Sequence, residues 1–267
     1  MPRRLRGVQQ EPERVFTIHS FRVEQIELHH DALRPGSRPL TIVHLTDLHL
    51  RRWGRQHELL IETVNEREVD FVFVTGDFIT RRRASIPCAE DLVKQMKCRY
   101  GVFACRGNWE IAYAPPTRRL RPIMADWGAT LLVNESRTVE THAGTVRVSG
   151  LDDLAHGWPD FEAALGSPAE SADLTVLLSH APLAVALLPE GHHVDLVLSG
   201  HTHGGQIRIP FLWRALLPRC AGGFSDGLYE FGPVRLHISR GFGSAGIVPV
   251  RFNCPAQVAI LRMLPPT

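Results

Sequence analysis

The chain has 267 residues, of which 44% are hydrophobic and 22% charged, an ordinary composition for a soluble globular protein. Thirty basic residues nearly balance 28 acidic ones, so the net charge of +2 argues against nucleic acid as a partner. No apolar run approaches the roughly 20 residues of a membrane-spanning helix. The five cysteines form no Cys-x-x-Cys pair, which argues against a disulfide framework and favours a reducing compartment.

The N-terminal stretch is basic but has no apolar core that would mark a secretory signal. It carries Arg3, Arg4 and Arg6, followed by a polar segment. We therefore expect residues 1–14 to form a flexible basic tail and residues 15–267 to form a single domain. The expected location is the cytoplasm, with a peripheral position at the inner face of the membrane as an alternative.

In the first half of the chain, short apolar runs alternate with amphipathic stretches. Residues 15–28 predict one or two edge strands. Further strands are predicted at 40–45, 71–74 and 102–105, with helices between them at 56–66 and 87–97. Because strand-helix-strand crossovers are right-handed, this order predicts a sheet with a parallel portion and helices on its faces.

The second half is predicted to be richer in strands. They are expected at 130–134, 137–141, 145–149, 174–179, 194–199, 234–239 and 257–263. One short helix is predicted at 159–165. We expect the last two strands to complete a second sheet. The predicted fold class is therefore α/β, with two packed mixed β-sheets flanked by helices in one compact domain.

Side chains of metal-binding types follow five of these apolar runs, each where the chain turns. They are Asp47, His49, Asp77, Asn108, His180, His201 and His203. One such residue is common in turns, so a single one indicates little. Five strand ends in chain order that all carry such residues predict a metal centre, because ligands bind beyond the carboxyl ends of strands in α/β sheets. Mixed carboxylate, amide and imidazole ligands favour Mn, Fe or Zn over Ca or Mg.

This series of motifs resembles the calcineurin-like metallophosphoesterase superfamily. The shared motifs are Asp-x-His at 47–49, Gly-Asp at 76–77, Gly-Asn at 107–108, a single His at 180 and Gly-His-x-His at 200–203. The segments 204–206 and 239–243 resemble its bacterial phosphodiesterase branch, similar to UDP-2,3-diacylglucosamine pyrophosphatase-type enzymes. The resemblance covers almost the whole chain after the first forty residues, and it implies a four-layer αββα sandwich.

The resemblance also implies a centre of two divalent ions. One ion would take Asp47, His49, Asp77 and His203, and the other Asp77, Asn108, His180 and His201. Asp77 would bridge the two, and Asp77, Asn108 and His201 would be the catalytic residues. The nucleophile would be a hydroxide that bridges the ions, because coordination lowers the pKa of water from about 15.7 towards about 7.

One residue departs from the family pattern. Trp109 stands where a His usually follows Gly-Asn, and an indole cannot donate a proton in acid catalysis. Either another residue fills this role, with His142, His156, His192 and His193 as candidates, or the leaving group needs no proton. A phosphate leaving group, whose second pKa is about 6, favours a diphosphate substrate over an alkyl phosphomonoester. Trp109 would then stack on a sugar or base, or else pack the pocket wall.

Other features near these turns have two interpretations each. Arg106 and Arg240 either clamp substrate phosphate or form surface ion pairs, and Asn108, Trp109 and Arg106 are the predicted substrate-binding residues. The basic run 81–83 either attracts anionic groups or forms a solvated loop. The apolar segment 210–219 either contacts a membrane interface or an acyl chain, or forms a helix that caps the core.

The sequence therefore predicts a two-metal phosphoesterase that hydrolyses a phosphodiester or pyrophosphate bond. Its substrate would be a phosphate-containing small molecule or a lipid-linked nucleotide, and the resemblance implies UDP-2,3-diacylglucosamine, in lipid A synthesis, as one such substrate. The first alternative is a soluble phosphodiesterase that acts on small or nucleotide diesters. The second is a non-catalytic scaffold of the same fold, which the seven filled ligand positions count against.

Overall fold

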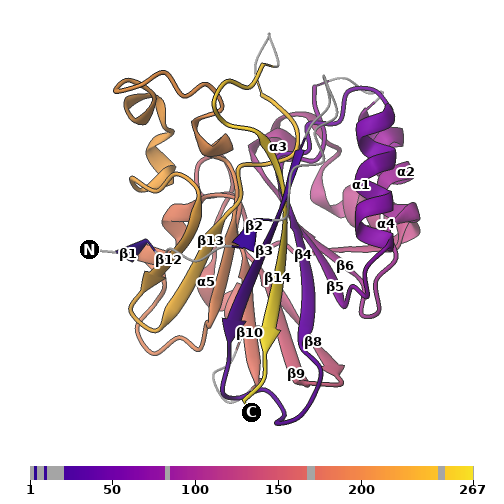
Figure 1. The fold of residues 1–267 in the computed structure, drawn as a ribbon. Helices are drawn as coiled ribbons and strands as arrows, with labels where there is room; N and C mark the ends of the chain where they lie inside the picture. The colour runs from indigo at the N-terminus through magenta and orange to yellow at the C-terminus, as the bar shows by residue number, and fades with distance from the viewer. Residues whose placement is uncertain are drawn as a thin grey trace.

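Two β-sheets pack face to face, and helices cover their outer faces (Figure 1). The computed structural model describes residues 3–4, 9–10, 21–81, 85–166, 172–245 and 250–266. Within these residues each sheet has seven strands and contains both parallel and antiparallel neighbours. The predicted α/β class, with two mixed sheets and flanking helices in an αββα sandwich, is thereby confirmed.

The first sheet is built around the predicted alternation of strands and helices. Its order is β2-β3-β14-β4-β5-β6-β7, and β4 to β7 run parallel. These four strands are β4 (Leu40–Leu45), β5 (Phe71–Thr75), β6 (Val102–Cys105) and β7 (Ala129–Leu131). The three strands predicted in the first half of the chain therefore lie side by side and parallel.

The strand expected at 257–263 does not complete the second sheet, so this prediction is wrong. It forms β14 (Ala256–Leu264), which inserts between β3 (Phe21–His29) and β4 of the first sheet. Val258 packs towards the helices and Leu261 towards the other sheet. A strand that is apolar on both faces suits the middle of either sheet, so its sequence does not determine which one it joins.

Four helices connect the strands of the first sheet. They are α1 (Arg55–Asn65), α2 (Ser85–Gln95), α3 (Asn108–Tyr113) and α4 (Thr117–Trp127). The first two lie within two residues of their predicted bounds, and α1, α2 and α4 cover the outer face of the sheet (Figure 1). In the described part of the chain, no helix is both long and apolar enough to cross a bilayer.

Helices α3 and α4 are absent from the sequence prediction. Pro122 lies inside α4, where a proline normally indicates a break. The buried face of α4 nevertheless follows helical spacing, through Leu120, Met124 and Trp127. Packing of this face on the first sheet thus outweighs the local signal of the proline.

The second sheet has the order β1-β12-β13-β11-β10-β9-β8, with β9, β10, β11 and β13 parallel. Its longer strands are β8 (Glu135–Thr141), β9 (Gly144–Gly150), β10 (Leu174–Leu178), β11 (Leu196–Ser199), β12 (Gly227–Phe231) and β13 (Val234–Ile238). All except β12 correspond to predicted strands. The predicted short helix is α5 (Phe161–Leu165), which packs on the outer face of this sheet.

The described parts of the predicted tail are paired with the sheets. The two-residue strand β1 (Arg3–Arg4) lies antiparallel to β12, and β2 (Gln9–Gln10) lies antiparallel to β3. These four residues are therefore not a free tail. The rest of 1–14, and residues 15–20 of the predicted edge strands, lie outside the described residues.

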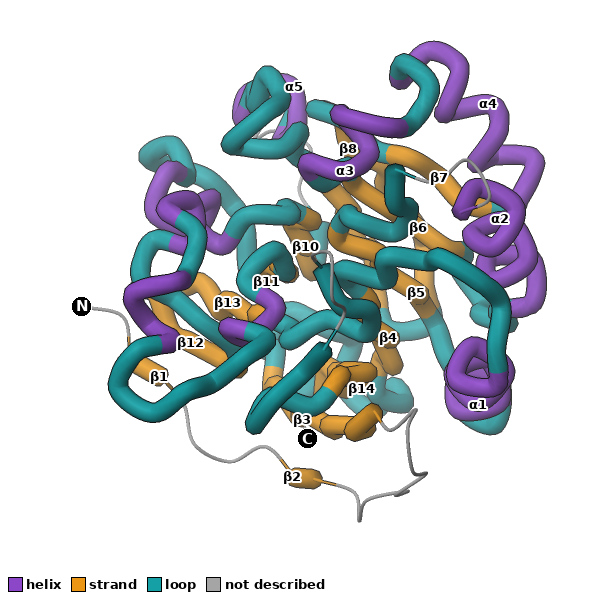
Figure 2. Tube along the Cα trace, turned by 90° about the horizontal axis from the view of Figure 1, so that it is seen from above, coloured by secondary structure: helices purple, strands orange, loops and turns teal. Residues whose placement is uncertain are grey.

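The alternation of side chains along the strands places the core between the sheets. In β5, Phe71 and Phe73 face the second sheet, whereas Val72 and Val74 face the helices. The turns that follow β4, β5 and β6 meet those that follow β10 and β11 at one end of the sandwich (Figure 2). This end is where the sequence places its polar turns.

Candidate metal centre

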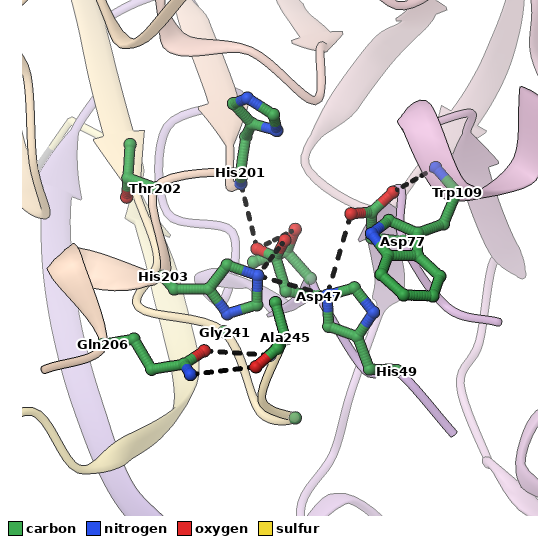
Figure 3. Close-up of polar contacts among 12 residues, drawn as sticks. Asp47, His49, Asp77, Trp109, His201, Thr202, His203, Gln206, Gly241 and Ala245 are labelled. Atoms are coloured by element: carbon green, nitrogen blue, oxygen red, sulfur yellow. Dashed lines mark hydrogen bonds and ion pairs between the residues drawn. The ribbon is translucent and has the colours of Figure 1, made fainter. Parts of the chain in front are cut away.

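The seven predicted ligands converge at this end of the sandwich. They follow five strands: β4 (Asp47, His49), β5 (Asp77), β6 (Asn108), β10 (His180) and β11 (His201, His203). Five of the seven side chains are buried, whereas Asn108 and His201 are partly exposed. Figure 3 shows His49 and His203 facing each other beside Asp47.

The first group of ligands forms around Asp47. His203 Nε2 lies 3.2 Å from Asp47 Oδ1 and 3.1 Å from His49 Nε2. The two imidazole rings stack, with their centroids 5.0 Å apart and their planes 16° from parallel. Ligand atoms of Asp47, His49 and His203, three of the four residues predicted for the first ion, therefore lie within 4.8 Å of one another.

The second group forms around His180. Its Nε2 atom lies 3.0 Å from His201 Nδ1 and 3.2 Å from Asn108 Oδ1. Asp77 Oδ2 lies 3.4 Å from the same nitrogen and 3.7 Å from His49 Nε2, so it stands between the two groups. Asp77 therefore lies near an imidazole of each group, and its role as a bridging carboxylate stays a prediction. Ligand atoms of Asp47, Asp77 and His180 also lie within 4.8 Å of one another, which brings Asp47 close to both groups.

The unpartnered oxygen of Asp47 and the low pKa values of two imidazoles fit a bound cation. Asp47 Oδ1 is buried and has no hydrogen-bond partner, a costly state that a divalent ion would relieve. Burial lowers the pKa of His203 to about 3 and that of His201 to about 4, which keeps both rings neutral at pH 7. Four imidazoles, two carboxylates and one amide form a donor set that suits Mn, Fe or Zn.

Neighbouring groups fix which nitrogen of two rings faces the centre. His180 Nδ1 lies 2.7 Å from the carbonyl oxygen of Thr75, to which it donates, so Nε2 is the nitrogen that faces Asp77. His201 Nε2 lies 3.0 Å from Cys220 Sγ, and its Nδ1 faces the second group. Such outer partners orient metal-binding imidazoles.

The turns that carry the ligands have strained backbones. Asp47, His49, Asp77, His201 and His203 all have positive φ, between 42° and 65°. For residues other than glycine this conformation costs on the order of 1–3 kcal/mol each and is concentrated at functional sites. Gly200 lets the turns approach, since a Cβ atom there would lie 1.9 Å from Thr46 Oγ1.

Glu110 is a site residue whose role the sequence prediction missed. Its buried carboxylate accepts hydrogen bonds from the backbone N–H groups of Asp77 (2.7 Å), Gly107 (2.9 Å) and Ile79 (3.2 Å). It therefore ties the Asp77 turn to the Asn108 turn. Burial, together with the Asp77 carboxylate, raises the pKa of Glu110 to about 7. Its position in the first turn of α3 is the available sequence signal.

Trp109 forms a wall of the first group. Its backbone N–H donates to Asp77 Oδ1 at 2.9 Å, and its indole meets the His49 ring edge-on with centroids 5.0 Å apart (Figure 3). Tyr113 packs against the indole at 5.2 Å. The expectation that Trp109 packs the pocket wall agrees with these contacts, whereas stacking on a substrate stays a prediction.

The two arginine candidates are engaged in ion pairs. Arg106 donates to both carboxylate oxygens of Asp152, at 2.6 and 2.7 Å, and to Thr117 Oγ1 at 2.7 Å. Arg240 is buried against Glu24 and lies 3.6 Å from Asp226. Both arginines therefore form ion pairs, but these pairs are largely buried and do not lie at the surface as expected. The role of Arg106 in substrate binding stays a prediction.

Three of the four histidines proposed as proton donors lie at the wrong end of the sandwich. His142 occupies the turn between β8 and β9, 3.1 Å from Tyr100 Oη, and His192 and His193 precede β11. These positions are remote from the carboxyl ends of β4, β5 and β6, so these candidates are wrong. His156, which follows β9 and lies 3.4 Å from Asp153 Oδ2, remains.

The predicted capping helix at 210–219 is not present. The segment contains two short 3₁₀ turns, η3 (Trp213–Leu216) and η4 (Arg219–Ala221), and Phe211 is fully exposed. In the basic run 81–83, Arg81 is exposed, and residues 82–83 lie outside those described.

A cavity of about 1090 Å³ opens beside His49. Its wall includes cationic, aromatic and apolar side chains, among them Arg51, Arg52, Trp53 and Val250. The candidate metal centre therefore adjoins a space large enough for a drug-sized ligand.

Comparison with known proteins agrees with this geometry. The family model described as calcineurin-like phosphoesterase matches residues 40–205, which carry all seven predicted ligands. Among solved structures, the sulfate thiohydrolase SoxB of Thermus thermophilus superposes with a TM-score of 0.53 at 15% identity, over 86% of this chain and 57% of that chain. At that identity the likeness concerns the fold alone.

Curated relatives are similar over most of this chain. An uncharacterized metallophosphoesterase of Helicobacter pylori is 34% identical over 239 residues, 85% of this chain, and this chain spans only 60% of that relative's length. YkuE of Bacillus subtilis, an uncharacterized metallophosphoesterase, is 30% identical over 83% of this chain and 78% of its own length. The phosphodiesterase YaeI of Escherichia coli is 26% identical over 86% of this chain and 84% of its own length. On the family match and these relatives, the chain belongs to the calcineurin-like phosphoesterase family.

Proposed function

We propose that the protein is a metal-dependent phosphoesterase that hydrolyses a phosphodiester or pyrophosphate bond at a two-metal centre. The observation that carries this proposal is the position of Asp77 Oδ2, 3.7 Å from His49 Nε2 and 3.4 Å from His180 Nε2. One carboxylate oxygen between two groups of ligands is the arrangement that two neighbouring cations need, because a shared anion offsets their repulsion.

Each group of residues would hold one divalent ion. The first would take Asp47, His49, Asp77 and His203, and the second Asp77, Asn108, His180 and His201. Bound ions would supply a hydroxide nucleophile at neutral pH and hold phosphate oxygens for in-line displacement.

The protein's own contribution is to orient the carboxylates. The backbone N–H of His201 holds Asp47 Oδ2 at 3.0 Å, and that of Trp109 holds Asp77 Oδ1 at 2.9 Å. The second oxygen of each carboxylate is thereby directed into the centre. We propose catalytic roles for Asp77, Asn108 and His201, whose side chains surround His180 Nε2 in the second group.

The leaving group is the basis for the proposed substrate. Because Trp109 cannot protonate a departing alkoxide, a leaving group that is itself a phosphate fits best. A lipid-linked nucleotide such as UDP-2,3-diacylglucosamine has such a bond. The cavity beside His49, with Arg51, Arg52 and Trp53 in its wall, has the charge and the aromatic surface for a nucleotide diphosphate.

A soluble phosphodiesterase that acts on small or nucleotide diesters is the second candidate. The same cavity favours it, and the E. coli relative is called a phosphodiesterase. Metal-loaded protein should be assayed with bis-p-nitrophenyl phosphate, cyclic nucleotides and the acylated UDP-sugar. Hydrolysis of the UDP-sugar alone supports the first candidate, and hydrolysis of the diesters supports the second. Metal binding without hydrolysis of any substrate would leave the non-catalytic scaffold.

A further inference from the structure

Exposed apolar side chains gather in two stretches beside the metal centre. Six of the nine large hydrophobic residues that are exposed in the described chain lie there, and together we call them the apolar ridge: Ile207, Ile209, Phe211, Leu212, Val250 and Phe252. Single exposed hydrophobic residues are normal on soluble proteins, whereas a contiguous group marks an interaction surface.

Backbone contacts join the two stretches into one surface. Ile207 pairs with Phe252 in a parallel bridge. The N–H of Arg208 donates to the carbonyl of Phe252, and the N–H of Phe252 donates to the carbonyl of Gln206, both at 2.9 Å. The loops that carry the ridge rise above the carboxyl ends of the strands (Figure 1). The ridge begins at Ile207, four residues after the metal-ligand candidate His203, so it lies close to the candidate metal centre in the chain.

Phe211, in the apolar ridge, is held in an unfavourable backbone conformation. Its φ is 67°, a region that bulky residues avoid, and its side chain is fully exposed. The following turn is nevertheless held by side-chain contacts, because the guanidinium groups of Arg208 (4.7 Å) and Arg214 (5.0 Å) both lie over the Trp213 ring. Local structure thus presents the aromatic ring outward at an energetic cost, which points to a partner that receives it.

Arginines outnumber acidic residues in the chain around the ridge, and the neighbouring Asp226 is engaged in an ion pair with Arg208 at 2.6 Å. Residues 201–225 contain three arginines and no acidic residue, and residues 231–267 also contain no acidic residue. Arg51 and Arg52, in the wall of the neighbouring cavity, add positive charge on the same side. Apolar groups combined with arginines suit an anionic lipid surface, where the rings enter the interface and the cations contact headgroups.

We propose that the apolar ridge docks the protein on an anionic lipid bilayer. Val250 belongs both to the ridge and to the wall of the cavity beside His49, so docking would direct the cavity towards the lipid. Binding itself does not depend on catalysis. Only its consequence, access to a lipid-linked phosphoester, rests on the proposed function.

Vesicle flotation tests this proposal with the purified, metal-loaded chain. Wild-type protein should float with vesicles of phosphatidylcholine and phosphatidylglycerol but not with phosphatidylcholine alone, and added salt should weaken the binding. The double variant Phe211→Ser and Phe252→Ser should partition at least about tenfold more weakly, because two rings leave the interface. Trp158→Ser is the matched control, since Trp158 is 87% exposed and lies beside the β8 edge, away from the ridge.

Three results would overturn the proposal. These are absence of binding to anionic vesicles, equal loss of binding in the Trp158 control, and unchanged binding in the double variant. Concentration-dependent self-association that the double variant abolishes, without lipid binding, would assign the ridge to a second copy of the chain instead.

Hydrolysis of bis-p-nitrophenyl phosphate in the absence of lipid is the separate readout of the proposed function. It should be equal in wild type and the double variant. Lipid binding without hydrolysis would reject the proposed phosphoesterase activity and support the docking surface. Hydrolysis without lipid binding would support the activity and reject the docking surface.

Discussion

The Nε2 atoms of His49 and His203 lie 3.1 Å apart in stacked rings. Burial lowers the pKa of both rings, which disfavours the imidazolium form of either one. Between the two Nε2 atoms, two neutral imidazoles can share at most one proton in a hydrogen bond. A metal ion, by contrast, can accept the lone pairs of both nitrogen atoms. We therefore expect this pair to link the stability of the fold to metal binding.

Metal removal should lower the thermal stability of the protein. At a free metal concentration of about 100 times Kd, binding adds roughly 2.7 kcal/mol, which corresponds to about 5 °C or more in Tm for a chain of this size. Calorimetry with Mn²⁺ or Zn²⁺, with and without a chelator, measures the shift. Ca²⁺ should give a smaller shift because of the imidazole ligands. Equal Tm values in all these conditions would show that the two rings bind no metal.

Asp77→Asn should reduce turnover more than about a hundredfold, because the amide is a weaker ligand in the position between the two groups. Circular dichroism should show a folded variant. Asp91→Asn, at an exposed position of α2, is the control and should retain wild-type turnover. Undiminished hydrolysis by the Asp77 variant would exclude the two-metal mechanism.

Much of the site was predictable because its signals are local. Each of β4, β5, β6, β10 and β11 is a short apolar run that ends at a ligand, and parallel strands bring such ends together. Asp47 and His203 are 156 positions apart in the chain, yet both could be assigned to one centre from their position after a strand.

The remainder depends on tertiary contacts. The exposure of Phe211 and the pairing of Ile207 with Phe252 follow from how two loops meet, and neither loop alone indicates it. Glu110 reads as an ordinary helix residue until the Asp77 turn is placed above it. In each case the contacting segment is distant in sequence, and no local sequence pattern indicates the contact.

Trp109→His should change the choice of leaving group. A histidine at this position would restore a proton donor, so hydrolysis of alkyl phosphoesters should rise about tenfold or more relative to that of p-nitrophenyl esters. The backbone hydrogen bond to Asp77 is retained in this variant. Trp109→Phe controls for loss of the indole, and equal leaving-group dependence in the two variants would refute the proposed effect.

Glu110→Ala should destabilise the fold by about 3 kcal/mol or more. Three buried backbone donors lose their acceptor, and each unsatisfied group costs about 1–3 kcal/mol. Metal affinity should fall as well, since the Asp77 turn loses its link to the Asn108 turn. Denaturant unfolding of the metal-free protein separates the two effects. Glu110→Gln keeps the shape of the side chain and should lie between the wild type and the alanine variant.

The buried histidine pair behind the metal centre should make the metal-free protein sensitive to acid. His44 Nδ1 lies 2.9 Å from His237 Nδ1, and both rings are fully buried between the sheets. Burial, and secondarily Arg240, lowers the pKa of His237 to about 3, with Asp226 acting in the opposite direction. Burial, and then His237, also lowers the pKa of His44.

Both rings are neutral in the folded protein at pH values where the unfolded chain binds protons. The free energy of unfolding should therefore be insensitive to this pair above pH about 6.5 and fall as pH decreases from 6.5 towards 3, by up to about 1.4 kcal/mol per pH unit for each ring. His237→Gln removes one titrating group, so its unfolding free energy should fall less steeply in this window. The ligand histidines titrate in both proteins and cancel in the difference. Exposed His193→Gln is the control, and an unchanged slope in the His237 variant would show that the buried pair does not govern acid stability.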